Sequence, residues 1–267
     1  MGILSGLRLY TAMARTTLQS RAIYRANFGL SLVFNSIMVT AELIVTLLLV
    51  HRVHGILGWN TAQVMLLFGM ATTSGGTYRT FLSELSYFDK YLVNGEFDAV
   101  LTRPVPAWLA VAGRSVDPDQ IGLVIEGMAI VAVSGTILGI FRLDAWLVIG
   151  ELLAAVVSGT LIWMAMVTAL AALGFWTTRV DTLQPMVLYG PQTAATFPLS
   201  VYPTDIRMLF YSIFPVAFGT YLPAMVILRK GPGAVMVLVS LFAAAAALAL
   251  ALRFWRFAVR HYTSTGT

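Results

Sequence analysis

The sequence contains no cysteine and few charged residues, and each shortage excludes a class of protein. With 267 residues and no Cys, the chain forms no disulfide, uses no thiolate nucleophile and offers no Cys-ligated zinc site. Only 11% of the residues are charged, whereas soluble domains carry roughly 25%. Because 58% of the residues are hydrophobic, most of the folded surface cannot face water. The composition excludes a soluble enzyme and a disordered protein, and it indicates a polytopic membrane protein.

Lysine is also scarce, and its positions exclude ATP hydrolysis by the P-loop route. Lys90 and Lys230 are the only lysines, and neither follows a glycine-rich turn, so the sequence has no G-x-x-x-x-G-K-[ST] loop. His51 and His54 have no nearby third metal ligand. We therefore expect no catalytic residue, metal site or cofactor on this chain. The net charge of +5 is interpreted as a signal of membrane orientation rather than of nucleic-acid binding.

Six apolar segments are long enough to cross a bilayer, which takes about 20 mostly apolar residues per helix. Helices are expected because lipid offers backbone polar groups no other partner. The predicted spans are 28–50, 61–82, 120–141, 145–176, 183–201 and 234–252. A further apolar segment, 206–228, is interrupted by Pro215 and Pro223. These prolines predict a broken or re-entrant helix.

The distribution of basic residues indicates the orientation of the spans. If 206–228 enters and returns on one side, six spans leave five of the 17 basic residues outside and put both termini in the cytoplasm. A seven-span alternative leaves six outside, so this count barely separates the two. We expect an all-α integral membrane protein with six transmembrane helices, a re-entrant hairpin before the last span, and cytoplasmic termini. The expected parts are a basic interfacial segment at 1–26, a membrane domain at 27–257 and a cytoplasmic tail at 258–267.

The longest polar segment, 84–119, joins the second and third spans and lies in the cytoplasm in this topology. Within it, 94–103 is predicted to form a short helix. Asn94 is a suitable N-cap, Glu96 suits the positive end of the helix, and Pro104 stops it.

One face of this short helix is apolar, because Phe97, Val100 and Leu101 stand at i, i+3 and i+4. Such a knob suits docking into a groove on a cytoplasmic partner. A helix lying flat on the membrane is an equally good interpretation of the same spacing.

Several ionisable residues lie within or at the ends of the predicted spans, where charge is costly and often functional. Glu42 is in the middle of the first span, Glu126 is in the third and Glu151 is near the start of the fourth. They either line a pathway or are paired with a polar neighbour inside the bundle. Arg79 and Glu84 are expected to tie the end of the second span to the loop that follows.

Two sets of residues resemble motifs of the ABC type-2 transporter permeases. The first resembles a "G-x-hydrophobic-D-x-x-L-x-R-P" stretch, and the second a "YP … P-x-A-F … Y-x-P-A" pattern, in the same order along the chain. The residues that carry the resemblance are Gly95-Glu96-Phe97-Asp98-Ala99-Val100-Leu101-Thr102-Arg103-Pro104, Tyr202-Pro203, Phe214-Pro215-Val216-Ala217-Phe218 and Tyr221-Leu222-Pro223-Ala224.

The resemblance implies the membrane subunit of an ATP-driven exporter in a bacterial inner membrane, surrounded by lipid. It implies a second permease, identical or related, and separate ATPase subunits that hold the ATP and Mg²⁺. The implied coupling helix, which docks on the ATPase, comprises Asn94, Glu96, Phe97, Asp98, Val100, Leu101, Arg103 and Pro104. The candidates for the substrate pathway are Asn35, Glu42, Tyr202, Pro203, Pro215, Tyr221 and Pro223.

Two other classes of function stay open at this point. An ATP-independent secondary transporter or channel would use ion-binding residues at the membrane midplane and usually an internal repeat. A membrane sensor that moves no substrate would carry the same docking helix. The low charge of the expected pathway favours a lipid-like, peptide or hydrophobic drug-like substrate.

Overall fold

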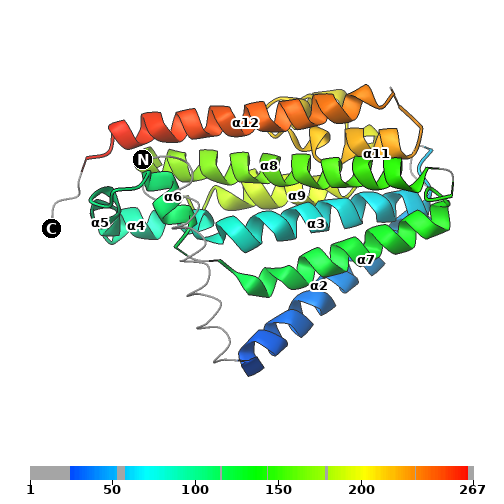
Figure 1. Cartoon of the computed structure of the whole chain (residues 1–267), viewed down its shortest axis with the longest axis horizontal. Helices are drawn as coiled ribbons and strands as arrows, with labels where there is room; N and C mark the ends of the chain where they lie inside the picture. The colour runs from blue at the N-terminus through cyan, green and yellow to red at the C-terminus, as the bar shows by residue number, and fades with distance from the viewer. Residues whose placement is uncertain are drawn as a thin grey trace.

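The computed structural model describes residues 25–52, 58–114, 116–142, 144–177, 180–231 and 233–263. These residues are all-helical, apart from turns and connecting loops (Figure 1). The predicted interfacial segment 1–26 lies almost wholly outside the described residues. The last four residues of the predicted tail 258–267 lie outside them as well.

Five long helices make up most of the fold. They are α2 (Arg25–Arg52), α3 (Thr61–Ser86), α7 (Ile121–Leu138), α8 (Ala145–Thr177) and α12 (Val235–Arg260). In Figure 1, α3, α7, α8 and α12 lie side by side along the long axis, whereas α2 leans away from them. Within the described ranges, four helical segments are long and apolar enough to cross a membrane: Gly29–Arg52, Pro118–Leu138, Ala145–Thr177 and Val235–Arg260.

Helix α3 has 26 residues but is not among these four apolar segments. It lies inside the bundle, packed against α7 on one side and α8 on another. Glycines permit the approach to α7: a Cβ added at Gly76 would lie 2.9 Å from the Leu123 Cβ and 3.0 Å from the Val124 nitrogen. A helix covered by protein on several sides needs less apolar surface than one that faces lipid.

The predicted fifth span, 183–201, is not one continuous helix. It consists of a π-helical turn (Pro185–Tyr189), α9 (Gly190–Ala195) and a 3₁₀ turn (Leu199–Val201). Pro198 stands between α9 and the last turn, and proline lacks the N–H that would continue a helix. Six uninterrupted spanning helices are therefore not found in the described residues.

The segment 206–228 is bent, as its prolines predict. It comprises α10 (Thr204–Tyr211), a 3₁₀ turn (Val216–Phe218) and α11 (Tyr221–Ile227). The pair Thr204–Tyr211 and Val216–Ile227 is bent by 74°. A bent helix pair of this length and composition is either one broken span or a re-entrant hairpin.

Three short helices gather at one end of the bundle, which we call the loop end. They are α4 (Asp89–Val93), α5 (Glu96–Leu101) and α6 (Ala107–Ala112), and they lie beside the C-terminal end of α12 (Figure 1). A 3₁₀ turn, Pro118–Gln120, then leads into α7.

The opposite end of the bundle is held by two cations that follow α11. The guanidinium of Arg229 lies 2.7 Å from the carboxylate of Glu151 at the start of α8. The ammonium of Lys230 donates hydrogen bonds of 2.6 Å to the Gly58 carbonyl and the Gln63 side chain, and it lies over the Trp59 ring. These contacts tie the bent segment to α8 and to the start of α3.

Candidate functional site: a polar cavity and the loop end

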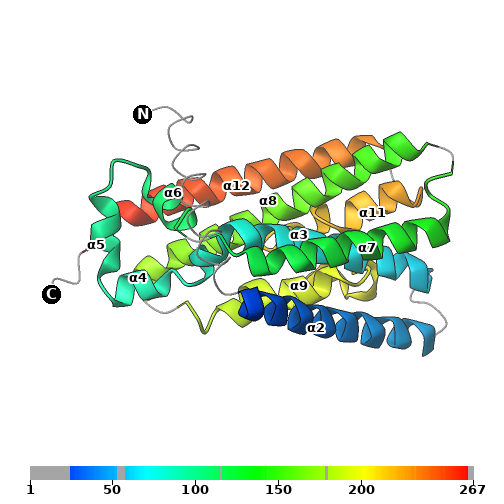
Figure 2. The same ribbon diagram turned by 60° about the horizontal axis from the view of Figure 1, so that its bottom comes forward.

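A cavity of about 360 Å³ lies between α2, α3, α7 and the segment that contains α9; we call it the main cavity. In Figure 2, α2 and α9, which form two of its walls, lie next to each other at the lower side of the molecule. It is lined by Asn35, Met38, Val39, Glu42, Phe68, Ala71, Thr72, Gly76, Arg79, Gln120, Leu123, Tyr189, Gln192, Thr193 and Thr196.

One face of α3 supplies a wall of the main cavity. Phe68, Thr72, Gly76 and Arg79 follow one another at intervals of three or four residues, which is the spacing of one helix face. The face changes from apolar at Phe68 to cationic at Arg79 over about 16 Å of helix rise. The cavity is therefore amphipathic along its length.

Among the residues that the structure describes, Arg79 is the only cation that lines the main cavity. One Nη2–H donates a 2.7 Å hydrogen bond to Gln192 Oε1, and Nε–H donates a longer one, 3.4 Å, to the Tyr78 hydroxyl. Within the described part of the chain, no carboxylate lies within ion-pair distance of this guanidinium. The expectation that Arg79 and Glu84 tie the end of this span to the following loop is confirmed for Glu84, which accepts a 2.5 Å hydrogen bond from the Tyr91 hydroxyl of the loop. It is wrong for Arg79, which bonds to Gln192 and Tyr78 instead.

A second cavity of about 220 Å³ adjoins the main cavity on the side of the loop end; we call it the end cavity. The two share Arg79, Gln120 and Tyr189. The same face of α3 continues into the end cavity through Ser83 and Ser86. Arg79 therefore stands where a polar path from the loop end meets the deeper main cavity.

The predicted pathway residues divide into two groups in space. Asn35 and Glu42 line the main cavity, as a pathway residue should. The structure does not bring the remaining five to this cavity. Tyr202 packs edge-to-face on Phe210, Tyr221 lies against Trp59, and Pro223 is buried within α11. Pro203 and Pro215 precede α10 and the 3₁₀ turn Val216–Phe218.

The two other acidic residues in these helices have polar partners. Glu151 is 5% exposed and pairs with Arg229. Glu126 accepts a 2.9 Å hydrogen bond from the Thr40 hydroxyl and so links α7 to α2. The interpretation of these two carboxylates as paired structural groups is confirmed.

The loop end contains the segment predicted to be a docking helix, and its helix is shorter than expected. Helix α5 covers Glu96–Leu101 rather than 94–103. Asn94 does not cap it: Gly95 is the N-cap, in the left-handed region with φ 69°, and no side chain caps the helix. Glycine adopts this conformation without the penalty that a Cβ brings.

The three apolar residues of α5 do not form one outward-facing knob. Phe97 and Val100 are buried inside the chain's own loop end, whereas Leu101 is 43% exposed. The prediction of an exposed knob is therefore wrong for Phe97 and Val100. Periodicity showed that these residues share a side of the helix, but not that this side faces the protein itself.

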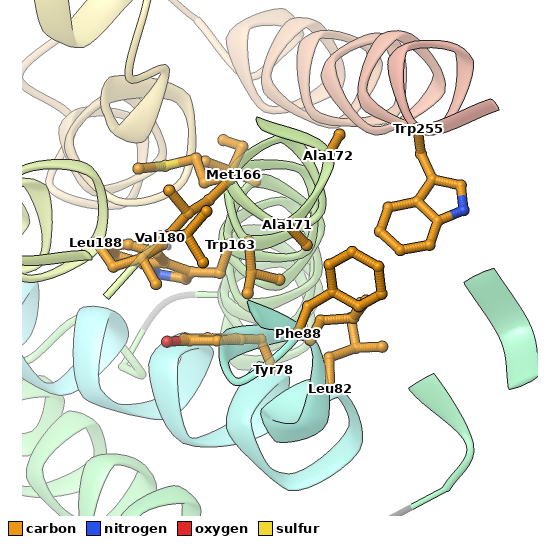
Figure 3. Close-up of a cluster of buried hydrophobic side chains, with 14 of the residues drawn as sticks. Tyr78, Leu82, Phe88, Trp163, Met166, Ala171, Ala172, Val180, Leu188 and Trp255 are labelled. Carbon is orange, nitrogen blue, oxygen red and sulfur yellow. The ribbon is translucent and has the colours of Figure 1, made fainter. Parts of the chain in front are cut away.

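Phe97 is held by aromatic rings from four other parts of the chain. Its ring centroid lies 5.2 Å from those of Phe88 and Phe175, 5.1 Å from that of Tyr262 and 6.4 Å from that of Trp255. All four contacts are edge-to-face, which is a favourable geometry for aromatic pairs. Figure 3 shows Trp255 of α12 directed at Phe88. We call these five residues the aromatic cluster; it fixes α5 to the ends of α8 and α12.

Polar contacts complete the loop end. Arg114 forms a 3.0 Å ion pair with Glu96 and lies over the Tyr91 ring. Burial raises the pKa of Tyr91 well above its ordinary value, and the hydrogen bond to the Glu84 carboxylate raises it further. Burial, together with the Asp98 carboxylate, also raises the pKa of Tyr262. Both phenols therefore stay neutral at physiological pH.

The other predicted docking residues lie at the surface or close to it. Asn94, Arg103 and Pro104 are exposed, and Asp98 is half-buried. Among the described residues, no group of three or more His, Asp or Glu side chains is placed to hold a metal ion.

Sequence reasoning missed the polar residues that surround Arg79. Gln192 is 113 residues away from Arg79 along the chain, and no local pattern marks the pair. Gln120 and Thr196 also lacked a signal, because single hydroxyl and amide residues are common in membrane helices. Of the polar residues around Arg79, only Thr72 could have been found from the sequence, because it is spaced on one helix face with Phe68 and Arg79.

The comparisons with known proteins agree with the membrane architecture. A family model described as ABC-2 family transporter protein matches residues 36–266, which is most of the chain and includes the loop end and every cavity-lining residue except Asn35. No curated protein and no solved structure gives a match. The resemblance noted in the sequence is confirmed: the chain belongs to the ABC-2 family of transporter proteins.

Proposed function

We propose that the chain is the permease subunit of an ATP-driven exporter in a bacterial inner membrane. In this proposal it works with a second permease, identical or related, and with separate ATPase subunits. Membership in the family supports the presence of ATPase partners. The observation that carries the proposal is the loop end, where a short helix with an exposed rim is anchored by the aromatic cluster to two long membrane helices.

The exposed rim of the loop end is the proposed docking surface. The side chains of Leu101, Arg103 and Pro104 are exposed, whereas that of Phe97 is buried. In this arrangement Phe97 anchors α5, and its neighbours contact the ATPase. A movement of the ATPase then moves α5 and, through the aromatic cluster, the ends of α8 and α12.

In the proposed topology, the membrane is crossed six times and both termini lie in the cytoplasm. α2, α3, α7, α8 and α12 supply five crossings, and the interrupted segment 183–201 supplies the sixth. The burial of α3 between α7 and α8 supports its place among them. The bent segment 204–227 enters and returns on the outer side. The main cavity forms part of the path for a hydrophobic, lipid-like, peptide or drug-like substrate.

The decisive experiment is purification of the tagged chain from its native host in a mild detergent, with mass spectrometry of the proteins that stay bound. We expect a P-loop ATPase subunit, and we expect Leu101→Asp and Arg103→Glu to lose it. Arg142→Glu, an equally exposed charge reversal at the opposite end of the bundle, is the matched control. Recovery of a different permease in the same sample would indicate a heterodimer of permeases rather than a homodimer.

Two outcomes would contradict the proposal in different ways. Recovery of the chain alone, with transport that needs no ATP, would support the secondary transporter or channel. Recovery of the ATPase with no transported substrate would support a sensor.

A further inference from the structure

We infer that the junction of the two cavities binds the anionic head group of an amphiphile, and that Arg79 is the recognition residue. The inference deepens the proposed function, on which it rests, by naming the class of substrate. Three observations support it: the charge balance at Arg79, the polar groups around it, and the position of α2.

The first observation is that the guanidinium of Arg79 donates hydrogen bonds only to neutral partners among the described residues, while the Glu42 carboxylate attracts it electrostatically from beyond ion-pair distance. Gln192 and Tyr78 accept its hydrogen bonds, and its Nη1 donates none in this part of the chain. A cation inside a membrane protein is costly unless it is paired. A guanidinium has five donors in a planar fork, which matches the oxygens of a phosphate or carboxylate. The site therefore has donor capacity for one anionic group.

The second observation is that neutral donors and acceptors surround the same junction. Gln120 and Tyr189 line both cavities, and Thr72 and Thr193 line the main one. Hydroxyl and amide groups hydrogen-bond to the ester, hydroxyl or phosphate oxygens of a head group. Gln120 already donates to Asp117 and Thr193 to the Tyr189 carbonyl. An apolar molecule would nevertheless use none of the hydrogen-bonding capacity that remains on these groups, which is unfavourable.

The third observation is that the wall formed by α2 faces outward as well as inward. Met38 lines the main cavity and is nevertheless 53% exposed. The neighbouring turns of α2 expose Phe34, Ile37 and Val45. An amphiphile with its head at Arg79 therefore has an apolar surface along α2 for its tail. A free anion would make no use of this surface.

Two carboxylates also face the cavities, and they define the opposing prediction. Glu42 lines the main cavity, and Asp117 lines the end cavity, where it accepts a 3.3 Å hydrogen bond from Gln120. If the ligand were cationic, Glu42 would be the residue that recognises it. For an anionic head, Glu42 is repulsive, so its neutralisation strengthens binding.

The test uses the full-length chain in nanodiscs that contain equal amounts of phosphatidylglycerol and phosphatidylcholine. Lipid retained after transfer to detergent is counted by native mass spectrometry. We expect the chain to retain one tightly bound phosphatidylglycerol. Arg79→Gln should reduce this bound fraction about tenfold, the change that 1.4 kcal/mol corresponds to. Arg79→Lys should give an intermediate bound fraction, because the ammonium keeps the charge but loses the planar fork. Arg142→Gln, which removes an exposed arginine away from the cavities, should keep all of it.

Two further binding measurements determine the chemical class of the ligand. We expect Glu42→Gln to retain phosphatidylglycerol at least as well as the unchanged chain, and inorganic phosphate at millimolar concentration to displace none of it. Loss of retention in Glu42→Gln would overturn the inference, as would unchanged retention in Arg79→Gln. Displacement by phosphate would replace the amphiphile with a soluble anion and would also overturn it. Helical circular dichroism and a single gel-filtration peak verify that each variant is folded.

Failure of the inference is distinguishable from failure of the proposed function. If the ATPase subunit co-purifies but Arg79→Gln retains phosphatidylglycerol, only the inference is overturned. If the lipid is bound at Arg79 but no ATPase is recovered, the site stands and the exporter proposal falls.

Discussion

Arg229 occupies a backbone conformation that glycine usually occupies. It follows the end of α11 with φ 54°, and its N–H and that of Lys230 close the helix by bonding to Val226 and Met225. Glycine is the common residue at such a position, and a side chain there costs roughly 1–2 kcal/mol. The side chain that is present reaches the carboxylate of Glu151, which is 5% exposed. We infer that neutralising this buried carboxylate outweighs the backbone strain.

This balance predicts that Arg229→Gly destabilises the protein although it relieves the strained φ. Leaving the Glu151 carboxylate buried without its partner should cost about 3–5 kcal/mol, more than the strain that is relieved. The thermal denaturation midpoint of the chain in nanodiscs should therefore fall. Adding Glu151→Gln to Arg229→Gly should recover part of the loss, because the amide carries no charge. A midpoint that rises in Arg229→Gly would mean that the strain is the larger effect.

At the scale of elements, the loop end behaves as one packed unit rather than as a free loop. Phe97 belongs to α5, whereas Phe175 and Trp255 belong to α8 and α12. Their ring contacts bury the side of α5 that would otherwise face a partner. The helix is too short to be stable by itself, so tertiary contacts hold it in place.

The packing of Phe97 predicts a local loss of stability in Phe97→Ala. Truncation of a buried Phe costs about 3–5 kcal/mol, and hydrogen exchange of residues 89–112 should accelerate by at least about a hundredfold. Leu101→Ala is the control, because this exposed side chain should change exchange little. Unchanged exchange in Phe97→Ala would show that the aromatic cluster does not hold the loop end.

The crossing of α3 and α7 depends on the absence of side chains at a few positions. A Cβ at Gly76 would lie 2.9 Å from the Leu123 Cβ and 3.0 Å from the Val124 nitrogen, and the backbone atom cannot move aside without shifting α7. Gly150 in α8 has nothing within 4 Å of its added Cβ. The two glycines therefore form a natural test pair.

Gly76→Ala should destabilise the bundle, whereas Gly150→Ala should leave it unchanged or stabilise it slightly. Overpacking costs about 1–3 kcal/mol, and an alanine at an open helical position gains up to about 1 kcal/mol over glycine. Thermal denaturation midpoints of both variants, measured in the same nanodiscs, test the difference. Equal midpoints would mean that α7 moves away from α3 without cost.

For the whole molecule, the sequence allowed the long helices to be predicted better than the site. The predicted spans 145–176 and 120–141 correspond to α8 and α7, because apolar runs in lipid must form helices. Of the predicted pathway residues, Asn35 and Glu42 line the main cavity, and their role in a pathway stays a prediction. The contact between Arg79 and Gln192 depends on how distant segments pack, and single-sequence patterns do not encode that information. For the same reason, the sequence did not predict that the Phe97 side chain is buried inside the protein.

The proposed orientation gives a prediction that the composition makes easy to test. The chain has no native cysteine, so a single introduced thiol is labelled without background. Thr102→Cys at the loop end should react with an impermeant maleimide only when the cytoplasmic side is accessible. Asp144→Cys, exposed between α7 and α8, should react only from the outside. Labelling of both residues from the same side would contradict the six-span topology.

Helix α8 connects the two ends of the molecule as one uninterrupted helix. Near one end, Phe175 contacts Phe97, and near the other, Glu151 holds Arg229 after the bent segment. Its 33 residues contain no proline, and they form a rod of about 50 Å. By contrast, α3 is kinked at Leu82, where φ is −134°. If α5 is the docking helix, as we propose, we expect its displacement to move α8 as a rigid body and so to shift Arg229 and the bent segment at the other end by the same amount.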